Sequence, residues 1–161
     1  MLFKDHPNVI KAVYYGAICH QKTGNIEQYL GGLDEVLALQ KTGPLAGATA
    51  YQRALEHYQA EEYVEAEPLF HLAASESDDA TYRHRALYSR ALCLEKMEEK
   101  KEFVPALKAI LADAGSPYKV QSERVLAHHY MMAGMDEEAL AHFIHLSMSK
   151  DSETRADAIL Q

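Results

Sequence analysis

Apolar residues along this 161-residue chain recur every three to four positions almost throughout, and no stretch alternates apolar and polar residues as a strand does. Glycine, proline and short polar runs interrupt the pattern around Gly24, Gly43 and Pro44, residues 75–79, 115–117, Gly134 and residues 149–152. The intervals between them suit helices of about 12 to 15 residues, near the average for globular proteins. The pattern therefore predicts an all-α fold.

The chain also repeats itself. Four segments align, each as a helix end, a polar turn and the start of another helix: HQKTGNIEQYLGGL, YQAEEYVEAEPLF, LEKMEEKKEFVPAL and YMMAGMDEEALAHF. Their turn positions are Gly24, Glu61, Glu98 and Gly134, at steps of 37, 37 and 36 residues. Four helix hairpins with one period are expected to stack into a solenoid.

Positions that did not define the alignment support it. Seven residues before each turn position lies an alanine, as expected where two helices approach closely: Ala17, Ala54, Ala91 and Ala127. The second helix of each unit carries a large apolar residue, at Leu33, Phe70, Leu107 and Phe143, and a further apolar residue three positions later, at Val36, Ala73, Ile110 and Leu146. This spacing predicts a buried helix face.

The segments GMDEEALAHF (134–143) and EEYVEAEPLF (61–70) resemble the turn and second helix of the tetratricopeptide repeat (TPR) family. The other two units depart from the family pattern, since Tyr29 and Phe103 stand where Ala66 and Ala139 match it. The resemblance implies a single domain, residues 1–161, forming an α-α superhelix of about four stacked hairpins. The approximate repeats are 9–45, 46–82, 83–118 and 119–150, and residues 151–161 are expected to form a capping helix or the start of a further repeat.

In this family the first helices line a concave groove that binds partners. Tyr14, Tyr51 and Tyr88 are 37 residues apart at positions that the resemblance places in the groove, and the fourth unit has Arg124 there. The candidate peptide-binding residues are Tyr14, Ile18, Tyr51, Leu55, Tyr58, Tyr88, Leu92, Arg124 and His128. Aromatic area and phenolic hydrogen bonds would suit an extended or helical peptide. An equal alternative is that the tyrosines fill space between neighbouring repeats.

Charge narrows the choice of partner. The formal net charge of -8 argues against nucleic acid, whose binding requires an excess of Lys and Arg. Family members that clamp the carboxyl termini of heat-shock chaperones do so with Lys and Asn in the groove, and apart from Lys11 and Arg85 that pattern is missing.

No apolar run approaches the ~20 residues of a membrane span, and the N-terminus does not resemble a signal peptide. We therefore expect a soluble chain, cytoplasmic rather than periplasmic.

Few residues suggest a catalytic or metal-binding site. No nucleophile elbow, phosphate loop or dinucleotide turn occurs, so neither an enzyme nor a cofactor is expected. His128, His129, His142 and His145 fall on two adjacent predicted helices, but neighbouring His128 and His129 point about 100° apart, which disfavours a metal site. Cys19 and Cys93 occupy equivalent places two units apart and are expected to be small buried side chains.

The sequence predicts a non-enzymatic scaffold that binds a protein or peptide in its concave groove. The alternative is a purely structural segment, which spaces neighbouring domains of a larger multi-repeat protein or self-associates through its end repeats. Neither nucleic acid nor membrane insertion is expected.

Overall fold

The computed structural model describes residues 6–148, apart from the side chain of Lys100, so the predicted helix at 151–161 lies outside the described residues. Within that range the chain forms eight helices and no strand: α1 (Pro7–Lys22), α2 (Ile26–Leu39), α3 (Pro44–Gln59), α4 (Tyr63–Ser75), α5 (Ala80–Lys96), α6 (Lys100–Ala112), α7 (Lys119–Met132) and α8 (Asp136–Ser147). The predicted all-α fold is confirmed.

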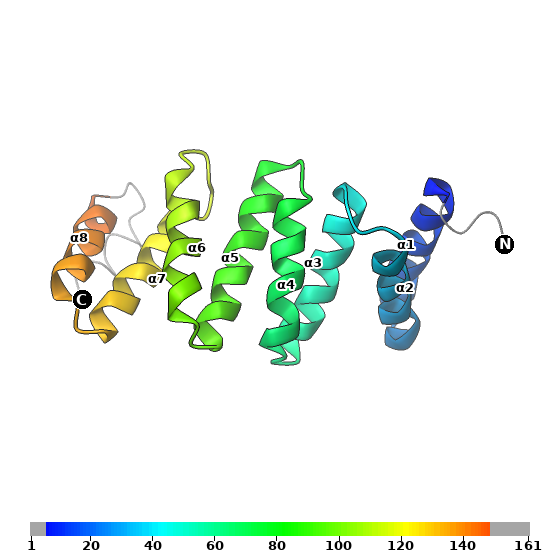
Figure 1. Ribbon diagram of the computed structural model, residues 1–161, viewed down its shortest axis with the longest axis horizontal. Coiled ribbons are helices and arrows are strands. Elements are labelled where there is room, and N and C mark those ends of the chain that lie inside the picture. Colours follow the sequence, from blue (N-terminus) through cyan, green and yellow to red (C-terminus); the bar gives the residue numbers. More distant parts are fainter. Residues whose placement is uncertain (1–5, 149–161) are drawn as a thin grey trace.

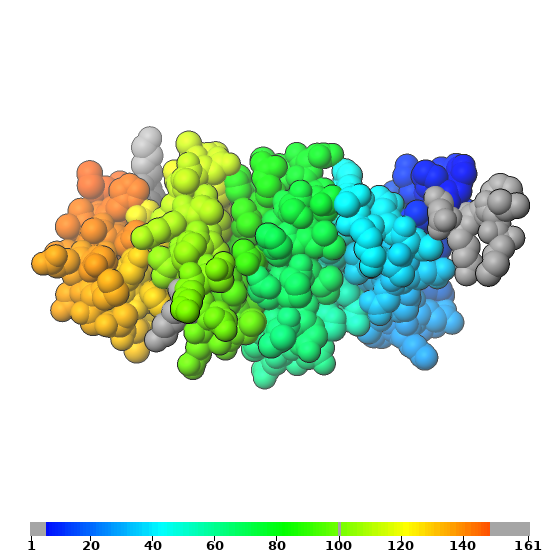
Figure 2. Space-filling model, in the orientation of Figure 1, coloured from blue at the N-terminus to red at the C-terminus, as the bar shows by residue number. Residues whose placement is uncertain are grey.

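The helices form four hairpins that follow one another in a row, from α1 and α2 at one end to α7 and α8 at the other (Figure 1). Contacts run between helices that are consecutive in the chain, both within a hairpin and from one hairpin to the next. The space-filling view shows the same order of neighbours along the molecule (Figure 2). Each hairpin thus buries its apolar faces on its neighbours, which is the α-α solenoid that the period predicted.

The four aligned turn positions share one backbone conformation. Gly24, Glu61, Glu98 and Gly134 all have a left-handed φ, between 58° and 77°. In each turn the next residue donates its N–H to a carbonyl five positions earlier, as Glu62 does to His57 at 2.9 Å and Glu99 to Leu94 at 2.9 Å. Bonds of this kind close the end of a helix. The alignment is therefore correct even where glutamate replaces glycine.

The repeated alanines lie where the helices of a hairpin approach. Ala17 is 2% exposed, and Ala54, Ala91 and Ala127 are fully buried. In the first hairpin the approach is especially close, because a Cβ atom added to Gly32 of α2 would lie 2.7 Å from the Cβ of Ala17. Glycine at position 32 is thus required by packing.

The second helices present the predicted apolar face to the core. Leu33, Phe70 and Leu107 are fully buried, while Phe143 in the last hairpin is only partly buried. Tyr29 and Phe103, which depart from the family pattern, are also core residues, at 0% and 1% exposure. The solenoid therefore accepts either a small or an aromatic residue at this position.

The two cysteines have different surroundings. Cys93 on α5 is buried among residues of α3 and α4, and this burial raises the pKa of its thiol to about 12. Cys19, the equivalent residue of α1, is exposed. The prediction for Cys19 is wrong because the first hairpin has no hairpin before it in the described residues to cover this position.

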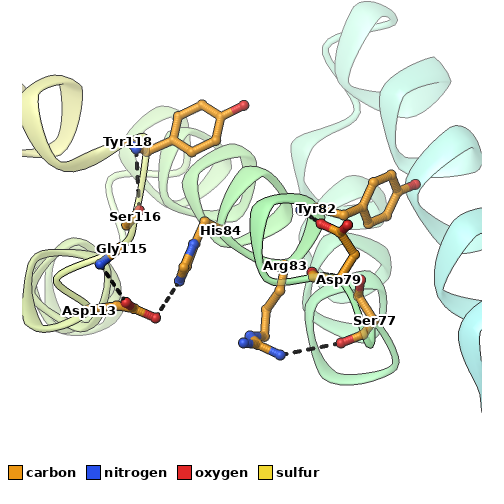
Figure 3. Close-up of polar contacts among 9 residues, drawn as sticks. All are labelled: Ser77, Asp79, Tyr82, Arg83, His84, Asp113, Gly115, Ser116 and Tyr118. Carbon is orange, nitrogen blue, oxygen red and sulfur yellow. Dashed lines mark hydrogen bonds and ion pairs between the residues drawn. The ribbon is translucent and has the colours of Figure 1, made fainter.

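The loops between hairpins are held by polar contacts (Figure 3). Asp113, at the end of α6, lies 2.8 Å through Oδ2 from Nε2 of His84 on α5, and its Oδ1 accepts the N–H of Gly115 at 2.9 Å. The Gly115 N–H and the His84 ring hold the pKa of the Asp113 carboxyl below its ordinary value. His84 itself is 4% exposed, so the contact anchors the loop before α7 to the interior of α5.

Candidate protein-binding surface

The candidate binding residues all lie on the first helices of the hairpins. Six of them, on α1, α3 and α5, are partly buried, and two, on α7, are exposed. We call these eight residues the first-helix surface: Tyr14, Ile18, Leu55, Tyr58, Tyr88, Leu92, Arg124 and His128. Residues four positions apart share a helix face, as Tyr14 and Ile18, Tyr88 and Leu92, and Arg124 and His128 do. Each first helix therefore presents one strip of this surface.

Tyr51, the ninth candidate, is a core residue. It is 3% exposed, and its ring centroid lies 5.4 Å from that of Phe70 and 5.0 Å from that of Tyr82. The guanidinium carbon of Arg85 lies 5.2 Å from the centroid of the same ring. Tyr51 thus fills space between the second and third hairpins, which is the alternative interpretation of the groove tyrosines. Almost none of its surface is accessible to a ligand.

Tyr88 occupies the equivalent position in the third hairpin but keeps more of its surface. Its ring stacks on Tyr118, with centroids 5.2 Å apart and planes at 21°. Burial raises the pKa of the Tyr88 hydroxyl, and the nearby Arg124 guanidinium partly offsets this effect. The structure therefore brings Tyr88 and Arg124 together from adjacent hairpins.

Sequence reasoning missed Tyr82 and Tyr118. Each lies at the start of a first helix and packs on the groove tyrosine of the preceding hairpin, Tyr82 on Tyr51 and Tyr118 on Tyr88. Asp79 accepts the N–H of Tyr82 at 2.8 Å, and the Ser116 hydroxyl accepts the N–H of Tyr118 at 3.2 Å (Figure 3). The signal in the sequence was their spacing of 36 residues, which matches the repeat.

Tyr58 and Tyr14 complete the phenols of the surface. The Tyr58 ring packs edge-on against Tyr63, with centroids 5.3 Å apart, and lies near enough to Glu95 for the carboxylate charge to influence the pKa of its hydroxyl. Burial raises the pKa of both Tyr14 and Tyr58 above the ordinary value. These hydroxyls therefore stay protonated at neutral pH and remain hydrogen-bond donors.

Two histidines of the last hairpin contact one glutamate. Glu123 on α7 is 9% exposed and has its carboxylate oxygens 3.1 Å from Nδ1 of His142 and 2.7 Å from Nδ1 of His145, both on α8. Among residues 6–148, no group of three or more His, Cys, Asp and Glu residues could hold a metal ion. His128 is exposed on α7 and is not part of this cluster.

No protein-family model matches the chain, and no curated protein matches it. Solved structures do match. A crystal structure of MamA superposes with a TM-score of 0.68 at 14% identity, covering 99% of this chain and 83% of the MamA chain. A structure of MamA AMB-1 has a TM-score of 0.68 at 22% identity, over 89% of this chain and 76% of that one.

A putative kinesin light chain of Podosopora anserina with nearly identical TPR-like repeats has a TM-score of 0.65 at 18% identity, covering 99% of this chain and 79% of that chain. At such identities the likeness concerns the fold alone. The chain has a TPR-type helical-repeat fold. A TPR-type fold generally suits the binding of other proteins, because stacked hairpins build an extended surface. Among the described helices, none is long and apolar enough to cross a membrane.

Proposed function

We propose that this TPR-type chain is a scaffold that binds a segment of another protein across the first-helix surface. The observation that carries the proposal is a partly buried phenol on each of three consecutive first helices, Tyr14, Tyr58 and Tyr88. A half-buried tyrosine offers rigid apolar area and a hydroxyl donor at a small cost in conformational entropy. Ile18, Leu55 and Leu92 add aliphatic area beside these rings.

The fourth hairpin supplies polar contacts to the same surface. Arg124 and His128 are exposed and stand one helical turn apart on α7. Arg124 lies close enough to Tyr88 to affect its pKa, so the charged and aromatic parts are continuous. A bound segment would therefore meet aromatic, aliphatic and cationic groups in succession.

A peptide array tests this proposal. Labelled protein is applied to an array of random-sequence peptides, and the affinity of the best binder is measured by fluorescence anisotropy. We expect the Arg124→Ala, His128→Ala double variant to bind at least about tenfold more weakly. Tyr88→Phe separates the contribution of the hydroxyl from that of the ring.

The control is a double variant on the second helices, His71→Ala with Lys101→Ala, since both side chains are exposed and lie outside the first-helix surface. Its affinity should equal that of the wild type. Equal losses in both double variants, or peptide-induced NMR shifts confined to α2, α4, α6 and α8, would contradict the proposal. Tyr51 is left intact because its removal would disturb the core.

A second candidate function, self-association through an end repeat, is favoured by the outer face of α8. Leu140 and Ile144 on this helix and Met148 directly after it are 59%, 52% and 76% exposed and stand four residues apart. Positions equivalent to Ile144 hold the exposed residues Asp34, His71 and Lys108, although another hairpin follows each of them. Among the four described hairpins, an apolar residue at this position is therefore particular to the α7–α8 hairpin and suits contact with a second copy of the chain.

A further inference from the structure

We propose that copies of this chain associate head to tail, so that α8 of one copy packs on α1 of the next. The inference rests on the second candidate function, self-association through an end repeat, and specifies which surface of the second copy meets α8. It is carried by a comparison of the two ends of the solenoid with the joints inside it. A joint is the contact between the second helix of one hairpin and the first helix of the following one.

On α1, three residues along one side of the helix are exposed, and we call them the head face: Ala12, Tyr15 and Cys19. Tyr15 is 63% exposed. The equivalents of Ala12 in the other three hairpins are fully buried: Thr49, Ala86 and Ser122. The equivalents of Tyr15 are partly buried: Gln52, Ser89 and Val125. The head face is therefore exposed at positions that the other hairpins cover.

The covered positions contact the preceding hairpin. The Tyr29 hydroxyl of α2 donates to Oε1 of Gln52 on α3 at 3.5 Å. Cys93 of α5, the equivalent of Cys19, belongs to one buried cluster with Ala66 and Phe70 of α4. The head face is thus the half of a joint that packs on the second helix of another hairpin.

The other half of a joint is exposed on α8, and we call it the tail face: Leu140, Phe143 and Ile144. Leu140 is 59% exposed, whereas its equivalents are partly buried: Leu30, Glu67 and Val104. Phe143 is partly buried, whereas its equivalents are fully buried: Leu33, Phe70 and Leu107. The two ends of the described solenoid therefore expose the two complementary halves of one repeated contact.

Two of the interior joints pair opposite charges. Nε of Arg53 on α3 lies 2.8 Å from Oδ1 of Asp34 on α2, and Nε of Arg90 on α5 lies 2.5 Å from Oε1 of Glu67 on α4. Both arginines occupy the same position of the first helix, 37 residues apart. In these joints an acid on one hairpin is therefore matched by an arginine on the next.

The head and tail faces are matched in a different way. Gly16 stands at the arginine position of α1, and Ile144 and Leu140 stand at the positions of the two acids. A Cβ atom added to Gly16 would meet no atom within 4 Å, so this position has room for a large side chain of a partner. Packing the tail face on the head face thus buries apolar groups together and leaves no charge of either face unpaired.

The two faces of one chain cannot meet, because α1 and α8 lie at opposite ends of the row of hairpins (Figure 1). A contact between two different surfaces is heterologous, and it continues from copy to copy unless the assembly closes into a ring. A second copy therefore continues the solenoid, and its own tail face is free to receive a third.

The test is complementation between two variants of the full chain, followed by sedimentation velocity. Tyr15→Asp places a charge on the head face, and Leu140→Asp with Ile144→Asp places charges on the tail face. The control is Gln21→Asp, which adds the same charge at an exposed residue of α1 about 180° around the helix from Ala12. Circular dichroism melting curves establish that each variant is folded.

We expect the wild type and the control to form dimers and, at higher concentration, longer oligomers. Each variant alone should associate at least about tenfold more weakly. An equimolar mixture of the two variants should form a dimer of one copy of each, because one intact head face and one intact tail face remain. This dimer should not grow, since both of its free faces carry Asp.

A second measurement uses the wild type without substitution at the contact. Cys19 lies on the head face and is exposed, whereas Cys93 is buried, so a thiol reagent reacts first at Cys19. Its reaction should slow about tenfold when about nine-tenths of the chains are associated, because only free head faces react. In Leu140→Asp with Ile144→Asp, the rate should not depend on protein concentration.

A Tyr15→Asp variant that associates as strongly as the wild type, or a Cys19 rate that stays constant while the wild type associates, would overturn the inference. So would a mixture of the two variants that stays monomeric. Each of these results leaves self-association through α8 standing. A wild type that is monomeric at every concentration would instead count against the second candidate function itself.

Discussion

Gly31 and Gly32 are neighbours in α2 with opposite environments. A Cβ atom at Gly32 would collide with Ala17 at 2.7 Å, whereas one at Gly31 would meet no atom within 4 Å. Two adjacent glycines in a helix weaken it, each by up to about 1 kcal/mol relative to alanine. Only at Gly32 does close packing therefore require glycine.

Alanine at each position separates these effects. We expect Gly32→Ala to lower the free energy of unfolding by about 1–3 kcal/mol through overpacking. Gly31→Ala should raise it by about 0.5–1 kcal/mol because glycine loses the most backbone entropy in a helix. Urea unfolding followed by circular dichroism measures both, and equal effects of the two variants would show that α1 and α2 do not approach closely at Ala17.

Glu61 and Glu98 hold a backbone conformation that suits glycine. Their φ angles are 62° and 58°, where the Cβ of an L-residue is crowded. We expect Glu98→Gly to raise the free energy of unfolding by about 1 kcal/mol, since the strain is removed. Glu99 has a φ of -79°, so Glu99→Gly serves as the control and should destabilise the chain. The measurement is the thermal midpoint of each variant; a lower midpoint for Glu98→Gly would contradict the strain argument.

At the scale of elements, the loop from α6 to α7 depends on the charge of Asp113. The Gly115 N–H and His84 depress the pKa of its carboxyl, so the ionised form stabilises the fold. This contribution is complete above the unfolded-state pKa of about 3.9 and is lost as the pH falls through the folded-state value.

The variant Asp113→Asn tests this dependence. We expect its urea midpoint to lie below that of the wild type near pH 7, and the gap to narrow toward pH 2, as the pH approaches the lowered pKa of the wild-type carboxyl. Asparagine retains an oxygen acceptor for Gly115 but places an amide nitrogen where Oδ2 faces His84, so the change of the gap with pH, rather than its size at one pH, reports the ionised group. A gap of the same size at both pH values would show that the charge contributes nothing.

At the scale of the whole molecule, the exposed apolar face of α8, the last of the described helices, predicts concentration-dependent association. Light scattering over a range of protein concentrations should show dimers of the wild type, and Leu140→Asp with Ile144→Asp should shift the equilibrium to monomers by placing charges in an apolar contact. The control is His71→Asp, at the position equivalent to Ile144 in the second hairpin. A wild type that stays monomeric throughout, or a control that dissociates equally, would rule out this surface.

Much of the fold could be predicted from single positions because every hairpin requires the same types of residue at equivalent places. A left-handed turn recurs at Gly24 and Glu61, and a small residue at Ala17 and Ala54, so the period appears in the chain itself. The candidate surface was harder to predict. The exposure of a tyrosine at the groove position depends on the side chains packed against it, which differ from unit to unit: Phe70, Tyr82 and Arg85 surround Tyr51, whereas Tyr118 stacks on Tyr88.

The sequence by itself determined the helical class, the register of the four hairpins and the positions of their turns, because these depend on local periodicity and backbone conformation. Only the tertiary structure decided that Tyr51 is covered while Tyr88 is half-buried, that Cys93 is enclosed while Cys19 is exposed, and that Glu123 joins two histidines. Equivalent positions of a repeat receive different neighbours in space. Burial, ring stacking and charge pairing follow those neighbours, and they decide which part of the repeated pattern remains available to a partner.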